Sequence, residues 1–584
     1  MFRAPDLVII GTGPLADAAL AALARRRLRV VRFEDIAGAD RHLAGARVVL
    51  LIAGEHSGAA LARLAELWAR TSRSGQRVVL LSGAGAPLPP SLPAMPAPVE
   101  RRLEHVILED AAARRLLARW PLHLGFDPAF GQRLHLLLAG RSALADALLA
   151  QALRVGHYSD CPPVITLLDP APDVWQAAVA GALPEAGHAG ELRFRPVSDP
   201  GLGDAPPVSS GIVCVAPPGT ALETAETLAA RLARERGISP PLLVEVGDVP
   251  TDGELPDWDG QILPFSARRM VLTPEVLLDG GGDELARVIH GHYRDTTAAQ
   301  GRDPGAEPSG RPWSDLADSY RDANRRQADH LGAKLAVTDC VAVAEELVES
   351  FAFAPTEVER LAVIEHARWA ADRYLDGWTY APVRDNARKH HPQLIPYADL
   401  SGPMKDLDRF AVRLVPALLA RSGRALMRML IVGVVEDAAG VGGGLRGPVD
   451  QVVNRLCARY PDRALVIAST LAGPGGRLLA RRARQLADAG LFLLCPGPVS
   501  GLLDAQPGAD ARLDCLGLIA VASRRISLPG EGEVERWLAE RAEILVQIGS
   551  HGAAGGDAGA DDGGRPRKRV WIDPGRGVDW GFEY

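Results

Sequence analysis

Short apolar runs alternate with longer amphipathic stretches through the first part of the chain. The runs have the length of β-strands, and the stretches between them are rich in alanine, leucine and arginine at helical spacing. Strands that alternate with helices form βαβ units around a parallel sheet. We therefore predict a parallel α/β unit over residues 1–130, with strands at 6–10, 29–33, 48–52, 77–81 and 106–108.

The same pattern begins again after residue 130. We interpret residues 131–295 as a second α/β unit and a diverged internal copy of the first. The polar, glycine- and proline-rich residues 296–312 are interpreted as a linker. A helix is predicted at 221–236, and strands are predicted at 133–139, 164–168, 191–197, 212–216 and 242–246.

Aromatic, histidine and arginine side chains become frequent in residues 313–425, and the alternation of strands and helices stops there. It resumes at the apolar run 429–433. Residues 426–584 are therefore predicted to form a third α/β unit, with a glycine-rich turn at 440–444. The predicted fold class is multidomain α/β, with Rossmann-like parallel-sheet units on both sides of a small, mainly helical module.

Composition narrows the classes of protein. The 584 residues are 47% hydrophobic and carry a formal net charge of −7. The sequence has no apolar run of the ~18 residues that cross a bilayer, and its start has no signal-peptide pattern. The six cysteines are scattered without a CxxC pair, which excludes a disulfide framework and a zinc ribbon. We expect a cytoplasmic protein without membrane insertion, and the negative charge argues against nucleic acid as its main partner.

The first predicted strand runs into the sequence Gly-Thr-Gly-Pro-Leu-Ala at residues 11–16, which opens a predicted helix. In a dinucleotide-binding turn, Gly11 would allow the tight turn, Gly13 would let the backbone approach a pyrophosphate, and Ala16 would pack the helix on the sheet. Glu34, 23 positions after Gly11, stands where an acid binds ribose hydroxyls. Two alternatives remain open here: a dinucleotide site, and a retained fold with an empty site.

A second copy of this turn, Gly-Arg-Ser-Ala-Leu-Ala, occupies residues 140–145. Gly140 is retained, but Ser142 replaces the second glycine and hinders close approach of a phosphate, although its hydroxyl is able to bind one. Asp169, 29 positions after Gly140, is the candidate ribose-binding acid. We interpret this copy as structural, with nucleotide binding as the alternative. Both units resemble the TrkA-N type of NAD-binding domain of bacterial potassium-transport regulators, which implies NAD or another nucleotide as cofactor.

The aromatic-rich segment carries a long and specific motif. It reads EHARW at residues 365–369, GWTYAPVRD at 377–385 and HPQL at 391–394. Over residues 313–420 the chain resembles the RyR domain, the repeat named after ryanodine receptors that also occurs in bacterial proteins. The resemblance implies a small helical unit with short strands and without an established catalytic activity.

Flat aromatic faces and guanidinium groups recur together in this segment, a combination that suits recognition of a ligand better than turnover. Trp369, Trp378 and Tyr380 offer faces on which a base could stack, and Arg368 and Arg384 are forked donors for phosphate. The alternative is a polar core whose members satisfy one another. The candidate ligand-binding residues are Asn324, Arg325, Asp329, His330, Glu365, His366, Arg368, Trp369, Trp378, Tyr380, Arg384, Asp385 and His391.

The third unit resembles, in its layout, the SLOG group of Rossmann-like nucleotide-sensing domains. Relatives have a Gly-His-Arg-like start after the first strand, where this chain has Gly-Val-Val-Glu at residues 433–436. They also have a polar strand end, where this chain has Gln-Ile-Gly-Ser at 547–550. These departures favour a structural or protein-contact role over a ligand site.

The sequence contains three kinds of unit that can each hold a nucleotide, and it has no HExxH or GxSxG motif. This combination indicates a protein that senses a nucleotide. No residue is predicted to be catalytic or to bind a metal. The leading hypothesis is a regulatory protein that binds NAD, ADP-ribose or a related messenger. Binding would change the packing of its domains or its contacts with a protein partner or a second copy of itself. The resemblances imply a role in ion-transport control or in stress and conflict signalling. This hypothesis requires an open hollow lined by side chains of residues 365–385. The alternatives are an NAD(P)-dependent oxidoreductase or nucleotide hydrolase, and a scaffold with vestigial sites.

Overall fold

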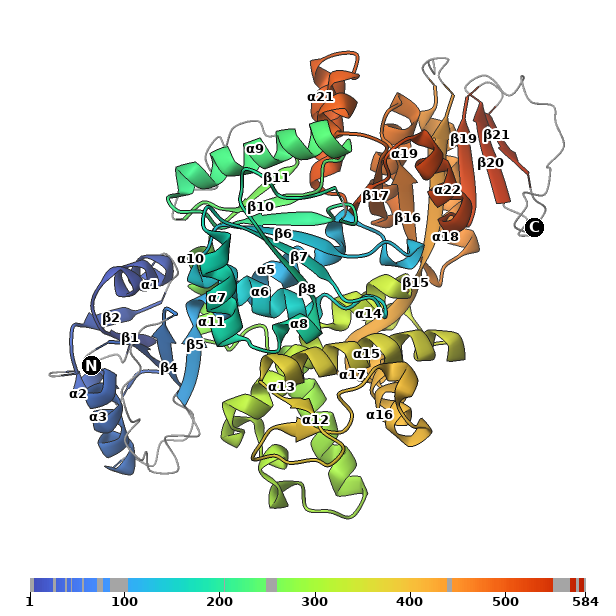
Figure 1. Ribbon diagram of the computed structural model, residues 1–584. Coiled ribbons are helices and arrows are strands. Elements are labelled where there is room, and N and C mark those ends of the chain that lie inside the picture. Colours follow the sequence, from blue (N-terminus) through green and yellow to red (C-terminus); the bar gives the residue numbers. More distant parts are fainter. Residues whose placement is uncertain are drawn as a thin grey trace.

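The chain folds into three parallel-sheet units and a helical segment between the second and third sheets (Figure 1). The first unit (blue) lies beside the second (cyan to green), the helical segment (yellow-green to yellow) lies below it, and the third (orange to red) lies on the far side. This arrangement confirms the predicted mixed α/β fold class. A computed structural model describes residues 5–24, 28–36, 39–43, 45–54, 57–70, 77–84, 103–203, 205–247, 260–437, 444–549, 568–573 and 577–581.

The first sheet has five parallel strands: β1 (Leu7–Ile10), β2 (Val30–Phe33), β3 (Val48–Ile52), β4 (Arg77–Ser82) and β5 (Leu103–Ile107). Their order is β2-β1-β3-β4-β5. Its helices are α1 (Pro14–Ala24), α2 (Asp40–Leu43) and α3 (Ser57–Arg70). Alternate side chains of β1 enter two core layers, Leu7 with α1 and Val8 with α3. Strand order changes direction between β1 and β3, so ligands are expected at the carboxyl ends of these strands.

The second sheet has six parallel strands: β6 (His135–Ala139), β7 (Val164–Leu168), β8 (Glu191–Arg195), β9 (Ser210–Val213), β10 (Leu242–Glu245) and β11 (Ile262–Phe265). Their order is β8-β7-β6-β9-β10-β11. Counted from its own first strand this is 3-2-1-4-5-6, the order of dinucleotide-binding sheets. Its helices are α5 (Leu108–Arg119), α6 (Ala143–Val155), α7 (Pro172–Ala182), α8 (Ala186–Ala189), α9 (Pro218–Arg236), α10 (Ala267–Val271), α11 (Pro274–Leu277) and α12 (Glu284–Ala299).

The segment that follows is mainly helical. Its helices are α13 (Asp318–Asp329), α14 (Leu331–Val337), α15 (Pro355–Leu375), α16 (Gly402–Arg413) and α17 (Val415–Ala420). Its strands are β12 (Cys340–Ala344) and the short parallel pair β13 (Thr379–Tyr380) and β14 (His390–His391).

Short 3₁₀ turns occur in both the second unit and the helical segment that follows it. They are Leu122–Gly125, Pro128–Phe130, Pro304–Ala306, Pro308–Gly310, Trp313–Asp315, Glu345–Leu347 and Tyr397–Asp399.

The third sheet is built around one long strand. Its strands are β15 (Arg424–Glu436), β16 (Arg463–Ser469), β17 (Gly490–Cys495), β18 (Arg524–Ser527), β19 (Ile544–Ile548), β20 (Lys568–Asp573) and β21 (Gly577–Trp580), in the order β18-β17-β16-β15-β19-β20-β21. They are parallel except for β21, and β12 of the helical segment pairs antiparallel with β15. Its helices are α18 (Arg446–Arg459), α19 (Pro474–Ala487), α20 (Val499–Asp504), α21 (Ala509–Ala520) and α22 (Glu531–Arg541).

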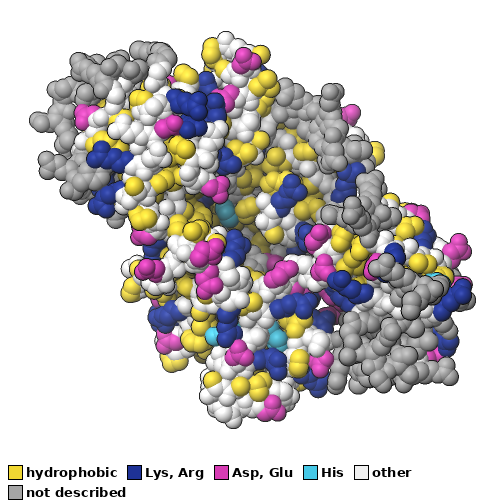
Figure 2. Space-filling view, turned by 180° about the vertical axis from the view of Figure 1, so that it is seen from behind, with side chains coloured by type: hydrophobic (Ala, Val, Ile, Leu, Met, Phe, Trp, Pro, Cys, Tyr) yellow, Lys and Arg dark blue, Asp and Glu magenta, His cyan; other side chains and the backbone are white. Residues whose placement is uncertain are grey.

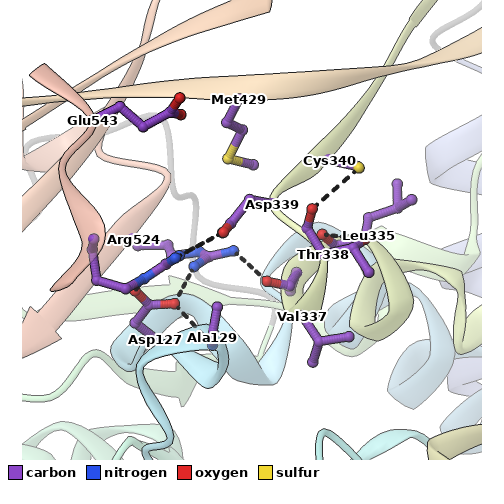
Figure 3. A network of polar contacts seen from close by, with 12 residues as sticks. Asp127, Ala129, Leu335, Val337, Thr338, Asp339, Cys340, Met429, Arg524 and Glu543 are labelled. Atoms are coloured by element: carbon purple, nitrogen blue, oxygen red, sulfur yellow. Dashed lines mark hydrogen bonds and ion pairs between the residues drawn. The ribbon is translucent and has the colours of Figure 1, made fainter. Parts of the chain in front are cut away.

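A buried ionic network joins the second unit, the helical segment and the third unit (Figure 3). The fully buried carboxylate of Asp127 accepts hydrogen bonds from Arg524 Nη1 at 2.7 Å, Arg541 Nε at 2.8 Å and Trp537 Nε1 at 2.9 Å. Arg541 also donates two hydrogen bonds to Asp339. Burial alone would raise the pKa of Asp127, but the two arginines hold it below its usual range.

The surface mixes both signs of charge. On the face shown in Figure 2, acidic and basic side chains lie close together, and hydrophobic side chains gather where the face is hollowed near its centre. Within the described parts of the chain, no helix is both long and apolar enough to span a membrane. Most of the predicted glycine-rich turn at 440–444 lies outside the described residues.

Candidate functional site

The turn between β1 and α1 is open to solvent. The φ angles of Gly11 and Gly13 are +133° and +90°, in the region that favours glycine. A Cβ on Gly11 would lie 2.7 Å from the Cβ of Ile52 in β3, whereas a Cβ on Gly13 would meet no atom within 4 Å. Thr12 and Gly13 are exposed, and Ala16 is buried where α1 packs on the sheet. Since the first N–H groups of a helix have no partner within it, this end of α1 offers donors to an anionic ligand.

An arginine that the sequence analysis missed braces this turn. Arg32 of β2 donates from Nε to the carbonyl oxygen of Gly11 at 3.1 Å, and its Nη1 lies 2.5 Å from Asp17 of α1. A charged residue inside an otherwise apolar strand was the signal that could have drawn attention to it. Glu34 follows β2 and is exposed. The turn therefore has a cation beside it and an exposed acid beyond the neighbouring strand.

The corresponding turn of the second unit is closed by the chain's own groups. Gly140 has a φ of +88°, and a Cβ there would lie 2.7 Å from the backbone nitrogen of Val215. The hydroxyl of Ser142 accepts a hydrogen bond from the backbone N–H of Ala145 and caps α6. The carboxylate of Asp169 accepts from the backbone N–H groups of residues 141 and 171, at 3.1 and 2.9 Å. The groups predicted to bind a nucleotide here hold the loop instead.

In the third unit a carboxylate occupies the start of a helix. Glu436, at the end of β15, accepts hydrogen bonds from the backbone N–H groups of Gly475 and Gly476 in the first turn of α19, both at 2.9 Å. A Cβ on Gly473 would overlap the same carboxylate. Because anions bind at the N-terminus of a helix, Glu436 takes the position that a phosphate would use.

The charged residues at the centre of the aromatic-rich segment satisfy one another. Glu365 is buried, its Oε1 accepts from Arg368 Nη2 at 2.7 Å, and its Oε2 lies 2.7 Å from Lys334 Nζ. Burial alone would raise the pKa of Glu365, but the two cations lower it overall. His330 is fully buried beside the carbonyl oxygen of His157 at 2.9 Å, and burial lowers its pKa. These residues form the polar core that was the alternative interpretation.

The aromatic residues of this segment pack on histidines. Trp369 meets His391 edge-on, with 4.9 Å between ring centroids, and Trp378 lies at 6.0 Å from the same ring. His366 lies between the carbonyl oxygen of Ile395, at 2.9 Å, and Asp408, at 3.3 Å.

The remaining predicted residues of this segment lie at or near its surface. Tyr380 is 55% exposed, and Arg384 is exposed and donates to Asn386. Asp385 accepts from two backbone N–H groups of its own loop, and Asn324 donates to the carbonyl oxygen of Tyr320. Within residues 365–385 the buried charges of Glu365 and Arg368 are therefore paired internally, while Tyr380 and Arg384 lie at the surface.

A cavity of about 940 Å³ lies elsewhere, between the first sheet, the second unit and α13. Its walls are residues 104–120 of β5 and α5, residues 264–283 around α10 and α11, and α13. Of the residues predicted from the sequence, Arg325 and Asp329 line it. The cavity could not be foreseen, because its walls come from segments far apart in the sequence.

Two strong ion pairs hold this cavity together. Arg114 donates from Nε and Nη2 to Asp329 at 2.7 and 2.8 Å, and Arg325 donates two hydrogen bonds to Asp283 at 2.9 and 2.5 Å. Bidentate pairs of this kind fix geometry as well as charge. They link α13 to α5 and to the residues before α12.

Titratable groups with shifted pKa values gather at one end of the cavity. Partial desolvation raises the pKa values of Asp110 and Asp318, although both side chains remain accessible to solvent, and lowers the pKa of His105. The Nε2 atom of His105 lies 2.8 Å from the hydroxyl of Ser82. No group of three or more potential metal ligands occurs among the residues that the structure describes.

Comparison with solved structures finds likenesses of low similarity. One is a D-isomer specific 2-hydroxyacid dehydrogenase family protein from Aeromonas salmonicida subsp. salmonicida, at 11% identity over 51% of this chain and 97% of that chain, with a TM-score of 0.21. Another is a dipicolinate synthase chain from Bacillus halodurans, at 12% identity over 38% of this chain and 88% of that chain, with a TM-score of 0.17. Likenesses at these TM-scores say nothing about what this chain binds.

The family model of the RyR domain matches residues 354–426. The match begins at the start of α15 and ends in the first residues of β15, so it contains the EHARW and GWTYAPVRD motifs. Helices α13 and α14 lie outside it, as do the predicted ligand residues Asn324, Arg325, Asp329 and His330. The match supports the predicted RyR resemblance for residues 354–426 of this chain.

Proposed function

We propose that this protein is a regulatory sensor that binds a nucleotide-type ligand (NAD, ADP-ribose or a related messenger) at the turn between β1 and α1. The observation that carries the proposal is a difference between the three sheet units. Carboxylates of Asp169 and Glu436 take the backbone donors at the turns of the second and third units, while the turn at residues 11–13 is exposed.

The chemistry of the open turn fits a pyrophosphate. It lies at the carboxyl end of β1, beside the switch point of the sheet, where Gly13 leaves room for close approach. Arg32, which is paired with Asp17, braces the turn through the carbonyl oxygen of Gly11, and Glu34 would accept hydrogen bonds from ribose hydroxyls. Under this proposal the first two units are related to TrkA-N domains and the third to SLOG domains, and the third unit has a structural role.

We propose ligand binding and not catalysis for this protein, because the buried charged residues of the segment 354–426 form ion pairs and hydrogen bonds with groups of the chain itself. Glu365 and Arg368 neutralise each other, and His366 is held between a carbonyl oxygen and Asp408. A sensor needs its ligand to favour one arrangement of the units over another. The readout would then be a protein partner in ion-transport control or stress signalling, or a second copy of the chain.

Isothermal titration of the full chain with NAD⁺, NADH, ADP-ribose and AMP tests the proposal. Thr12→Glu places a carboxylate on the exposed turn without changing a glycine, and repulsion of the phosphates should weaken binding at least about tenfold, or about 1.4 kcal/mol. Thr220→Glu is the matched control, because Thr220 is exposed in the first turn of α9.

The outcomes are distinct. Binding that Thr12→Glu weakens and Thr220→Glu leaves unchanged supports the proposal. Absence of heat with every nucleotide, or equal binding by both variants, refutes it. Chromatography of the titration mixtures gives a second readout. Conversion of any nucleotide would show that the protein is an enzyme and would refute the proposed sensor.

A further inference from the structure

Helix α5 has two faces with different surroundings. The face made by Leu108, Leu116 and Leu117 with two alanines is buried in the hydrophobic core. The opposite face lines the 940 Å³ cavity with small and charged residues: Asp110, Ala111, Arg114, Arg115, Ala118 and Arg119. Residues three and four positions apart share one helix face, so these side chains form a single stripe along the cavity.

Two guanidinium groups of this stripe lack an acidic partner. Arg114 is neutralised by Asp329, and Arg325, across the cavity, by Asp283. Within the described part of the chain, the side chain of Arg115 has no hydrogen bond or ion pair, and that of Arg119 makes only a contact over the ring of Trp120, at 4.4 Å. The fold thus leaves two positive charges, one helical turn apart, facing a cavity.

The opposite end of the cavity offers acceptors. Asp110 lies nine residues before Arg119, about 13 Å along the helix axis. Its carboxylate has no hydrogen-bond donor among the described residues. Asp318 of α13 also lines the cavity; its Oδ1 accepts from Arg321 Nη1 at 3.2 Å, which leaves its second oxygen for a ligand. The wall between the two ends carries the apolar side chains of Phe265, Met270 and Val276.

We propose that this cavity is a second ligand site, separate from the turn at residues 11–13, and that it takes a nucleoside phosphate. The phosphate would bind Arg115 and Arg119, since forked guanidinium donors suit phosphate oxygens. The hydroxyls of the sugar would donate to Asp110 and Asp318, and the base would lie on the apolar wall. A volume of about 940 Å³ is in the range of small-molecule sites.

Occupancy of this site would act on the packing of the units. The walls come from the last strand of the first sheet, from α10 and α11 of the second unit, and from α13, which leads through α14 to β12 and the RyR domain. The proposed ligand contacts α5, the apolar wall around α10 and α11, and α13, so it binds only when these elements are assembled and stabilises that arrangement. The site is therefore a regulatory one that couples the second unit to the helical segment that precedes residue 354.

Hydrogen–deuterium exchange of the full chain with AMP as the probe tests this site. AMP should slow exchange in α5, α10 and α13 together. Ribose 5-phosphate and inorganic pyrophosphate should protect the same segments at higher concentrations, and adenosine, which lacks the phosphate, should not. Protection by adenosine at the same concentration as AMP, or no protection of α5 by any phosphate compound, would overturn the proposal.

Variants separate the cavity from non-specific charge effects. Arg115→Ala/Arg119→Ala should weaken AMP protection at least tenfold, and Ala118→Trp should do so by filling the cavity without changing its charge. The control Arg234→Ala/Arg388→Ala removes the same charge from exposed positions outside the cavity and should leave AMP protection unchanged. Equal AMP binding by the control and both cavity variants would refute the assignment.

The two proposed sites fail independently. Thr12→Glu should leave the protection of α5, α10 and α13 by AMP intact, because residue 12 does not line the cavity. If AMP protects only residues of α1 and its turn, the nucleotide sensor stands and the cavity site falls. If it protects the cavity walls and Thr12→Glu changes no nucleotide affinity, the cavity site stands and the turn falls.

Discussion

Replacing Asp127 by Asn should loosen the contact between the second and third units. Asp127 is fully buried, and the change removes the negative charge that faces the buried guanidinium of Arg524, whose other acceptor is the neutral carbonyl oxygen of Ala336. Arg541 keeps its bidentate pair with Asp339, so the loss concentrates on Arg524. Removing one partner of a buried ion pair costs about 3–5 kcal/mol.

Native-state hydrogen exchange measures this loss locally. A chain with several units does not unfold in a single step, so a global unfolding free energy would be ill defined. The expected loss of opening free energy corresponds to roughly a hundredfold or greater acceleration of exchange in β18 and α22. Asp504→Asn, which weakens the exposed pair with Arg512, is the control and should have a small effect, because exposed pairs contribute little.

A double variant decides whether the unpaired charge is the cause. Asp127→Asn/Arg524→Met removes both charges and should exchange more slowly than Asp127→Asn alone, since a neutral replacement of a buried pair is often well tolerated. If Asp127→Asn exchanges at the wild-type rate, the network contributes nothing to the junction. If the double variant is less stable than the single one, unpaired charge is the wrong explanation.

Two buried or enclosed carboxylates give the remaining predictions. The folded-state pKa of Asp127 lies below its unfolded value of about 3.9. Its contribution to stability is therefore complete above that pH and is lost as the pH falls through the folded pKa. Hydrogen exchange in β18 should accelerate below about pH 4 for this reason, and Asp127→Asn should lack this pH dependence. Glu436→Ser should free the backbone N–H donors of Gly475 and Gly476. Inorganic phosphate should then raise the melting temperature of the variant and not that of the wild-type chain. An equal response of both proteins would contradict the assignment of Glu436 as the group that occupies the N-terminus of α19.

Local patterns were enough to predict the sheets. The apolar runs at 48–52 and 164–168 coincide with β3 and β7, because strand periodicity and length are properties of a few neighbouring residues. The turns at Gly11 and Gly140 were also visible, since both glycines adopt positive φ angles that other residues avoid. The short strand β11 was missed, because its four residues include a proline and give a weak signal.

Local patterns did not reveal which of these turns is open. That depends on Asp169 and Glu436, whose carboxylates reach backbone N–H groups 28 and 39 positions away along the chain. Local patterns also did not reveal the partners of Arg368, which was predicted to bind a ligand. In the structure Arg368 donates to Glu365, which also pairs with Lys334. A charged side chain pairs with whichever group the fold brings within a few ångströms.

The amino-acid sequence by itself determined the alternation of strands and helices, the places of the glycine turns and the resemblance of residues 354–426 to the RyR domain. Tertiary structure alone decided where a ligand could enter. The cavity wall joins Arg114 to Asp329 across 215 positions of sequence, and among the residues that the structure describes Arg115 and Arg119 have no acidic partner there, because α5 packs its other face into the core. Burial and charge pairing are set by the order in which sheets and helices stack, which a local pattern of residues does not contain.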